Sequence, residues 1–331
     1  MINRYLPFFI SVFVLFLMNM LMVSSVAPSL LVKQLLAWII GLIFFIFGTQ
    51  LNPKSLKNKQ LIIFIICCLL LSVPLLMNTF TRGSRRWIDI GFTTIQPSEI
   101  IKPLLLLFLI NTKYHFLAAI PILMTLIQPD LGSAITLSLL LTPFLIYEKY
   151  LQKLAILGFI SFLVFSPLIW KYVLKDYQRN RIINFINPNH DPLNQGYNVI
   201  QSKIAIGSGG FWGKGYKKGS QSQLFFLPEK HTDFMFAAIG EERGVVGITT
   251  IIGCYLVIII SLIAKAYDTT QNRPMFLFTL ALVFQIWIQS FINIGMNLGV
   301  MPVTGIPLPF LSVGGSSLIA LLLSLGIIFS I

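Results

Sequence analysis

Acidic and histidine side chains gather at the end of the longest polar stretch of this sequence. Glu229, His231 and Asp233 alternate along one short segment, and the acidic pair Glu241-Glu242 follows shortly after it. Ionisable groups held where a polar loop meets an apolar span are costly unless they serve a function. Several like charges in a partly dry site can make one carboxylate a better base. We therefore take Asp233 as the candidate catalytic base. The alternative is a helix N-cap, which is common for Asp before an apolar helix.

A basic run with a tryptophan forms a second candidate. Arg82, Arg85 and Arg86 lie close together, and Trp87 follows directly. Guanidinium groups form paired hydrogen bonds with phosphate oxygens, and tryptophan favours the lipid interface. The run therefore predicts either a site for a phosphorylated substrate or an anchor to lipid head groups.

Further polar residues stand at the ends of two short apolar runs. Glu99 and Lys102 are three residues apart at the start of a predicted helix, so they are close enough to form an ion pair. Asp130, between Pro129 and Gly132, could line a cavity or cap the next helix. Both roles stay open at this stage.

The last predicted span opens with prolines and then small residues. The stretch 305–317 contains Ser312, Gly314 and Gly315. A helix N-terminus there would attract anions, but small residues also let helices pack closely. No strand–turn–helix context or Gly-Lys-Ser/Thr accompanies the glycines, so nucleotide binding is not expected.

Composition places these candidates in a membrane protein. Of 331 residues, 56% are hydrophobic and only 11% are charged, against about 25% charged in soluble domains. The 24 Lys and Arg against 11 Asp and Glu favour anionic lipids or a phosphorylated substrate as partners. Nucleic acid is not expected, because the basic residues are spread over short loops. Cys67, Cys68 and Cys254 all lie in apolar runs, which predicts packing roles.

Apolar runs near the length that crosses a bilayer recur along the whole chain. We predict an all-α polytopic membrane protein with about ten transmembrane helices and both termini on one side. Residues 1–331 are treated as a single membrane domain. The predicted spans are 5–23, 34–51, 60–77, 99–111, 116–128, 131–147, 154–174, 240–264, 275–298 and 309–331.

The short loops set the predicted orientation. Lysines such as Lys54, Lys149 and Lys265 follow spans two, six and eight, so these loops and both termini are expected in the cytoplasm. The arginine run then lies on the outer face, where a bound anion would explain it. The runs 100–110 and 116–128 give only about 17–20 Å of helix, less than the roughly 30 Å hydrocarbon core. Their polar ends therefore predict a recessed outer cavity.

A long outer loop, about 175–233, separates spans seven and eight. Loops of this length are usually functional or disordered. Apolar residues at helical spacing between Gln195 and Ile206 predict a short helix lying on the membrane surface. Glycines and then the Asp233 segment follow it.

Taken together and in order, these motifs resemble the shape, elongation, division and sporulation (SEDS) family over nearly the whole chain. Within it, the chain is more similar to the cell-elongation member than to the division member. The motifs are Arg85-Arg86-Trp87, Gln96-Pro97-Ser98-Glu99, Pro129-Asp130-Leu131-Gly132, Asp176-Tyr177-Gln178-Arg179, Gln201–Gly210, Gly219–Gln223 and Pro228–Phe234.

The resemblance implies a peptidoglycan glycosyltransferase that polymerises lipid II on the outer face of the bacterial cytoplasmic membrane. It also implies a class B penicillin-binding protein as the cross-linking partner. The essential acid of the family corresponds to Asp233 and its loop tryptophan to Trp87. The substrate-binding residues that we predict are Arg85, Arg86, Trp87, Glu99, Lys102, Asp130, Lys203, His231, Ser312, Gly314 and Gly315.

The chemistry of such a reaction fits this residue set. The acceptor hydroxyl must lose a proton, so one base is required, and the pyrophosphate leaving group needs cations. Arginine side chains or a divalent cation, Mg²⁺ or Mn²⁺, could stabilise that charge, and no nucleotide cofactor is required. Two rivals remain open: a lipid II flippase, and a scaffold that only activates the penicillin-binding protein. A division polymerase is the alternative within the family.

Overall fold

The computed structural model describes residues 2–77, 86–89, 91, 94–173, 179, 183, 185, 195–224 and 226–330. This part of the chain is almost entirely helical, and its one sheet is a short antiparallel pair, β1 (Ile88–Asp89) with β2 (Thr94–Ile95). The predicted all-α class is confirmed. Arg82, Arg85 and Asp176, which the sequence singled out, lie outside the described residues.

A helix occupies the position of each predicted span. Five helices are long and apolar enough to cross a membrane, and shorter apolar helices join them. The protein is therefore a polytopic membrane protein. The helices are α1 (Ile2–Val26), α2 (Leu31–Gln50), α3 (Gln60–Met77), α4 (Pro97–Asn111), α5 (Ala119–Ile127), α6 (Leu131–Leu139), α7 (Thr142–Tyr147), α8 (Lys149–Leu168), α10 (Gln195–Ser208), α11 (Ser220–Gln223), α12 (Met235–Asp268), α13 (Arg273–Leu298) and α14 (Gly315–Ile328).

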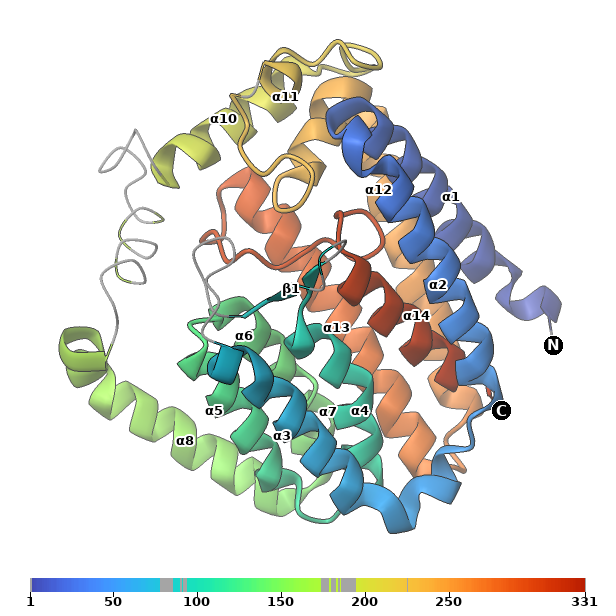
Figure 1. Ribbon diagram of the computed structural model, residues 1–331, viewed down its shortest axis with the longest axis vertical. Helices are drawn as coiled ribbons and strands as arrows, with labels where there is room; N and C mark the ends of the chain where they lie inside the picture. Colours follow the sequence, from blue (N-terminus) through green and yellow to red (C-terminus); the bar gives the residue numbers. More distant parts are fainter. Residues whose placement is uncertain are drawn as a thin grey trace.

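Helix α13 runs through the middle of the molecule. In Figure 1 it crosses the centre of the view, with α1, α2, α12 and α14 on one side and α3 to α7 on the other. It packs against α4, α6, α7, α10, α12 and α14, and it is the most enclosed of the five long apolar helices. Polar residues on α13 can therefore reach several elements at once.

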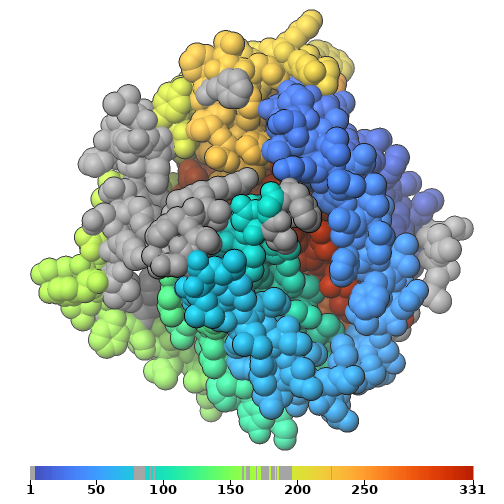
Figure 2. All heavy atoms as spheres, in the orientation of Figure 1, coloured from blue at the N-terminus to red at the C-terminus, as the bar shows by residue number. Residues whose placement is uncertain are grey.

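Helix α14 packs closely on α2 through glycines. A Cβ at Gly326 would lie 2.2 Å from the Phe45 carbonyl oxygen, and one at Gly48 would lie 2.8 Å from the Leu323 carbonyl oxygen. Only residues without a side chain allow the two backbones to approach this far. In Figure 2 the red atoms of the C-terminal region show in the space between the blue α2 and the blue-green α3–α4 region.

Several predicted boundaries were wrong for local reasons. The last helix begins at Gly315 and not at 309, because Pro307 and Pro309 remove backbone donors and the chain from 302 to 314 stays non-helical. The span 131–147 is two helices, α6 and α7, because the chain turns at Leu140-Leu141. Helix α12 begins before residue 240, at Met235.

Helix α12 is kinked at Gly244. This residue has φ +64° inside an otherwise helical run, a conformation that glycine adopts without strain. The kink separates the short first part of the helix, residues 235–243, which follows the Asp233 turn, from its long apolar part. The predicted helix between Gln195 and Ile206 is present as α10, and it packs on α12 and α13.

Candidate functional site

Asp233 lies in the turn that leads into α12. The N-cap position of that helix is occupied by Phe234, whose own side chain makes no capping hydrogen bond. Asp233 is therefore one residue before the N-cap position. The carboxylate is partly exposed, and its Oδ2 would lie 3.6 Å from a Cβ placed on Gly305. Asp233 thus faces the non-helical segment that precedes α14.

Two asparagines one helical turn apart on α13 hold the backbone at Asp233. The side-chain amides of Asn297 and Asn293 donate to the Asp233 carbonyl at 3.0 and 3.3 Å. The Asn297 Oδ1 also accepts from the Ala237 amide at 3.1 Å. Both asparagines are fully buried. Sequence reasoning missed them, although polar residues four apart within an apolar span were a visible signal.

The segment before α14 is fixed to the Asp233 turn. The Ser312 hydroxyl donates to the Thr232 carbonyl at 2.5 Å and accepts from the Leu308 amide at 2.8 Å. The Val313 amide donates to the His231 carbonyl at 2.8 Å. Ser312 is therefore buried in a structural role and its hydroxyl is used within the protein, whereas we predicted a substrate contact.

The opposite side of this segment touches the start of α6. A Cβ on Gly132 would lie 2.9 Å from the Thr304 carbonyl oxygen and 3.1 Å from the Ile306 side chain. Residues 304–306 therefore lie between Asp233 and the helix start that carries Asp130. The two candidate regions, far apart in sequence, flank the same stretch of backbone.

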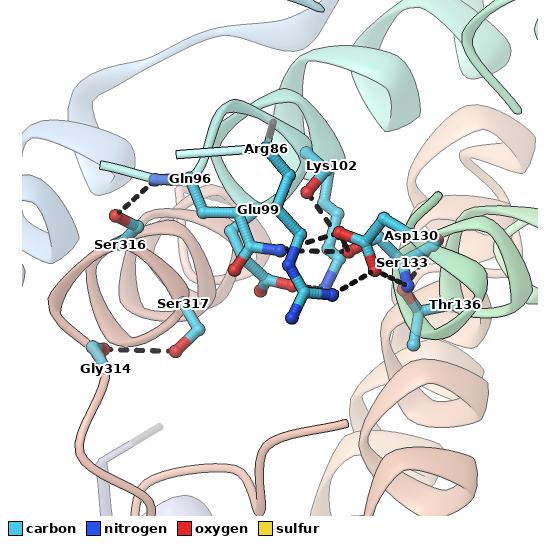
Figure 3. A network of polar contacts seen from close by, with 11 residues as sticks. Arg86, Gln96, Glu99, Lys102, Asp130, Ser133, Thr136, Gly314, Ser316 and Ser317 are labelled. Atoms are coloured by element: carbon cyan, nitrogen blue, oxygen red, sulfur yellow. Dashed lines mark hydrogen bonds and ion pairs between the residues drawn. The ribbon is translucent and has the colours of Figure 1, made fainter. Parts of the chain in front are cut away.

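Asp130 is the centre of a polar cluster (Figure 3). Its Oδ1 lies 3.2 Å from Arg86 Nη1, and its Oδ2 accepts from Gln96 Nε2 and Ser133 Oγ, both at 2.8 Å. The carboxylate also caps α6 by accepting from the Ser133 amide at 3.1 Å. Of the two roles left open by the sequence, the structure shows the helix cap, and the same carboxylate also holds an arginine.

Arg86 has hydrogen-bonding capacity left over. Its side chain is 28% exposed, and its buried Nε has no hydrogen-bond partner within the described part of the chain. Trp87 beside it is half-buried. An arginine held by one nitrogen with further N–H groups available is suited to bind a phosphate oxygen.

Glu99 and Lys102 form the predicted ion pair. Lys102 Nζ lies 2.6 Å from Glu99 Oε1, and both side chains are almost fully buried in the first turns of α4. Glu99 also lines a small cavity with Ser312, Ser317, Gln285 and Gln289. Figure 3 draws the pair together with Arg86, Gln96 and Asp130 of the polar cluster.

The remaining predicted residues lie around this region. His231 is partly exposed, with its Nε2 4.0 Å from the Glu229 carboxylate. Lys203 is an exposed residue of α10 near Gly299. Gly314 is the N-cap of α14, and its carbonyl accepts from Ser317. Gly315 begins the helix against α2, where its Cβ would lie 3.6 Å from that of Ala37.

Glu241 and Glu242 are not part of an acidic cluster around Asp233. The Glu241 carboxylate accepts from Lys214 Nζ, the Gln221 amide and the Ser222 amide at 2.8 to 2.9 Å. The Glu242 carboxylate accepts from Ser25 at 2.6 and 2.8 Å and from Gln223 at 3.0 Å. Both are fully buried and bond to Ser25 or to residues 214–223, so the expectation that they tune Asp233 loses its basis.

Lys230 belongs to this structural network. Its Nζ donates to the Ser222 carbonyl, and burial lowers the pKa of its amine while Glu242 and Glu241 oppose that shift. Among the described residues, no group of three or more His, Cys, Asp or Glu could hold a metal ion.

Comparison with known proteins identifies the family. A family model described as cell cycle protein, which groups FtsW, RodA and SpoVE, matches residues 2–331. The chain belongs to this family. The resemblance seen in the motifs is thereby confirmed.

Several members of the FtsW/RodA/SpoVE family are similar over most of their length. The peptidoglycan glycosyltransferase MrdB of Escherichia coli K12 is 38% identical over 88% of this chain and 82% of its own. The stage V sporulation protein E of Bacillus subtilis is 32% identical over 90% of this chain and 86% of its own.

Solved structures agree with these sequence relationships. A chain from a peptidoglycan synthase complex, in a study of how polymerisation and crosslinking are coordinated, has a TM-score of 0.81 and 31% identity, covering 97% of this chain and 96% of that one. The rod shape determining protein RodA of Thermus thermophilus has a TM-score of 0.69 and 25% identity, covering 98% and 94%.

Proposed function

We propose that this protein is a peptidoglycan glycosyltransferase that polymerises lipid II for cell elongation. Its relative MrdB carries that activity in its name and is 38% identical over most of both chains. The observation that carries the proposal within the structure is the placement of Asp233 and the Arg86–Asp130 cluster on the two sides of residues 304–306. A base and a phosphate-binding cation are the two groups that this reaction requires.

In this mechanism Asp233 accepts the proton of the acceptor hydroxyl as that oxygen attacks the anomeric carbon of the donor sugar. The bond from that carbon to the pyrophosphate oxygen breaks, and the lipid pyrophosphate leaves with the electron pair. Asn293 and Asn297 fix the Asp233 backbone, so the carboxylate meets the hydroxyl in a set position.

Arg86 stabilises the negative charge that develops on the leaving group. The Asp130 carboxylate holds Nη1 of the guanidinium, and the 28% of the side chain that stays exposed is available to a phosphate oxygen. Arg85, Trp87, Lys203 and His231 are proposed to complete the contacts to sugar and lipid. The buried Glu99–Lys102 pair supplies a second cation.

The protein is proposed to work from the outer face of the bacterial cytoplasmic membrane, with both termini in the cytoplasm. A structural relative comes from a complex that couples polymerisation with crosslinking. By the same reasoning, a class B penicillin-binding protein is the partner that cross-links the glycan made here.

Replacing the proposed base tests the function directly. Asp233→Asn keeps the size of the side chain but removes the basic carboxylate, so polymerisation of purified lipid II is expected to fall by roughly 100-fold or more. Glycan length and amount are measured by gel electrophoresis, with the partner's catalytic serine removed. A chelator arm shows whether a divalent cation contributes.

The matched control is Asp268→Asn, at the opposite end of α12. Asp268 binds Arg4 at 2.8 Å and takes no part in the proposed site, so this variant should keep wild-type activity. If Asp233→Asn inserts normally and still makes glycan at the wild-type rate, Asp233 is not the base. If wild type makes no glycan from lipid II supplied to the outer leaflet, the enzymatic proposal gives way to transport.

A further inference from the structure

The outer loop carries an aromatic cluster that the proposed reaction does not use. We name residues 209–219 the 209–219 loop. Phe211 is 61% exposed, Trp212 76% and Tyr216 42%. The Phe211 and Trp212 rings touch edge to face with centroids 5.1 Å apart. Adjacent exposed rings of this size mark a contact surface when they form a cluster.

The same loop is basic. It contains Lys214, Lys217 and Lys218 and no acidic residue. Lys214 forms an ion pair with Glu241, whereas Lys217 and Lys218 are exposed. Exposed rings next to lysines are typical of segments at the boundary between acyl chains and anionic head groups.

Two contacts place the loop at the level where helices leave the apolar region. The Val245 and Val246 amides donate to the Gly210 and Phe211 carbonyls at 3.0 and 3.2 Å, where the apolar half of α12 begins. The Tyr216 hydroxyl lies 3.0 Å from the hydroxyl of Ser24, which is in the last turn of α1, directly after the apolar run that ends at Val23. The start of the apolar part of α12 and the end of the apolar run of α1 therefore lie at the same depth in the membrane.

The exposed aromatic surface continues into the lipid-facing side of α12. Val245 and Val246 are exposed beside the loop, and exposed Leu256 and Ile260 lie farther along the helix. A helix that presents such residues along its length faces acyl chains in a polytopic protein. Phe211 and Trp212 therefore stand at the outer end of that surface.

The loop is also rigidly attached to the part of α12 that follows Asp233. The Lys214 and Gly215 amides donate to the Glu241 and Glu242 carbonyls at 2.9 and 3.1 Å. The kink at Gly244 makes room for this docking, since a Cβ there would lie 2.4 Å from the Gly213 nitrogen. The position of the loop along the membrane normal thus sets the position of residues 235–243 of α12.

We propose that the 209–219 loop is an interfacial anchor: Phe211 and Trp212 insert at the outer boundary of the acyl chains, and Lys217 and Lys218 bind anionic phospholipid head groups. Through α12 the anchor fixes the height of Asp233 relative to the head-group plane. The lipid contact is independent of sugar transfer, and its test measures no activity.

Tryptophan quenching in vesicles tests the insertion. The whole chain is reconstituted in phosphatidylglycerol–phosphatidylcholine vesicles with bromine placed either near the head group or near the acyl terminus. The Trp212 signal is the difference between wild type and Trp212→Phe. We expect this signal to be quenched mainly by the shallow bromine. A signal that neither bromine quenches would overturn the proposal and would assign the rings to a protein partner.

Trp287 provides a depth control. It is 49% exposed in the middle of α13, so its signal, obtained with Trp287→Phe, should be quenched mainly by the deep bromine. A Trp212 signal with the same depth preference as Trp287 would contradict an interfacial position.

The head-group preference is tested with brominated phosphatidylglycerol against brominated phosphatidylcholine at equal mole fraction. Two lysines near the surface should enrich the anionic lipid around Trp212, giving roughly twofold stronger quenching or more. In Lys217→Gln/Lys218→Gln this ratio should fall to about one. Equal quenching by the two lipids in wild type would overturn the anionic preference.

Discussion

Two sets of carboxylates lie close together in sequence at the start of α12, yet the fold treats them differently. Asp233 is held through its backbone, and its partly exposed side chain faces residues 304–306. Glu241 and Glu242 are held through their carboxylates, which are buried and bonded within the protein. This difference shows that a buried acidic side chain is not necessarily a catalytic one. What matters is which part of the protein its carboxylate faces.

Helix geometry explains why the two sets separate. From Met235 to Glu241 the helix rises by about 9 Å, at 1.5 Å per residue. The glutamates therefore reach the 209–219 loop, α11 and α1, whereas Asp233 remains beside α13 and the segment before α14.

The largest effect is expected from Gly244→Ala. The substitution forces an L-residue into φ +64° and brings a Cβ within 2.4 to 2.7 Å of backbone atoms of the 209–219 loop. The loop must move away, so we expect a loss of about 3 kcal/mol or more in unfolding free energy, with loss of polymerisation. Thermal unfolding measures the loss of stability, and the lipid II assay measures the loss of polymerisation.

Gly253→Ala is the matched control, because it lies in the same helix and its Cβ would meet nothing within 4 Å. It should leave stability and activity close to wild type. Equal behaviour of the two variants would mean that the kink does not position the loop.

Glu242→Ala tests the structural side of the comparison. The change leaves Ser25 and Gln223 without their buried acceptor, so the unfolding free energy should fall by about 1–3 kcal/mol. Any loss of activity should follow this loss of stability. Glu229→Ala, which removes an exposed carboxylate, should change stability by less than about 0.5 kcal/mol. A stable Glu242→Ala protein without activity would instead place Glu242 in the chemistry.

Asn297→Asp tests the catalytic side. It keeps an oxygen for the Ala237 amide but removes the donor to the Asp233 carbonyl. Because a small displacement of a base is costly, we expect kcat to fall roughly tenfold with little change in KM. Asn272→Ala, at the opposite end of α13, is the control and should behave as wild type. An unchanged kcat for Asn297→Asp would show that the backbone of Asp233 needs no such support.

The smallest effect concerns Lys230. Burial lowers its pKa from the ordinary 10.5, so the folded protein binds this proton less tightly than the unfolded chain. The resulting destabilisation is present below the lowered pKa and is relieved as pH rises toward 10.5. Wild type should therefore gain stability relative to Lys230→Met over that window, as measured by unfolding at several pH values. Lys57→Met, at an exposed position, is the control for the loss of a lysine.

The sequence alone was sufficient to predict the membrane architecture and to select the main candidate site residues. Hydropathy is a local property of the chain, so the positions of the spans and of the short helices α4, α5 and α10 could be read directly. Asp233 stood out because several acidic residues gather at the end of the long polar stretch, and Arg86 because it belongs to a basic run beside a tryptophan. The pairing of Glu99 with Lys102 followed from their spacing of three residues on one helix.

Only the tertiary structure decided which polar groups meet. Ser25 binds Glu242 across 217 residues of sequence, and Asn297 binds the Asp233 carbonyl across 64. Such contacts depend on how helices pack and on kinks such as Gly244, and neither can be read from periodicity. For that reason the sequence identified the acids of this protein, and the packing assigned Asp233 to the candidate site and Glu241 and Glu242 to the scaffold.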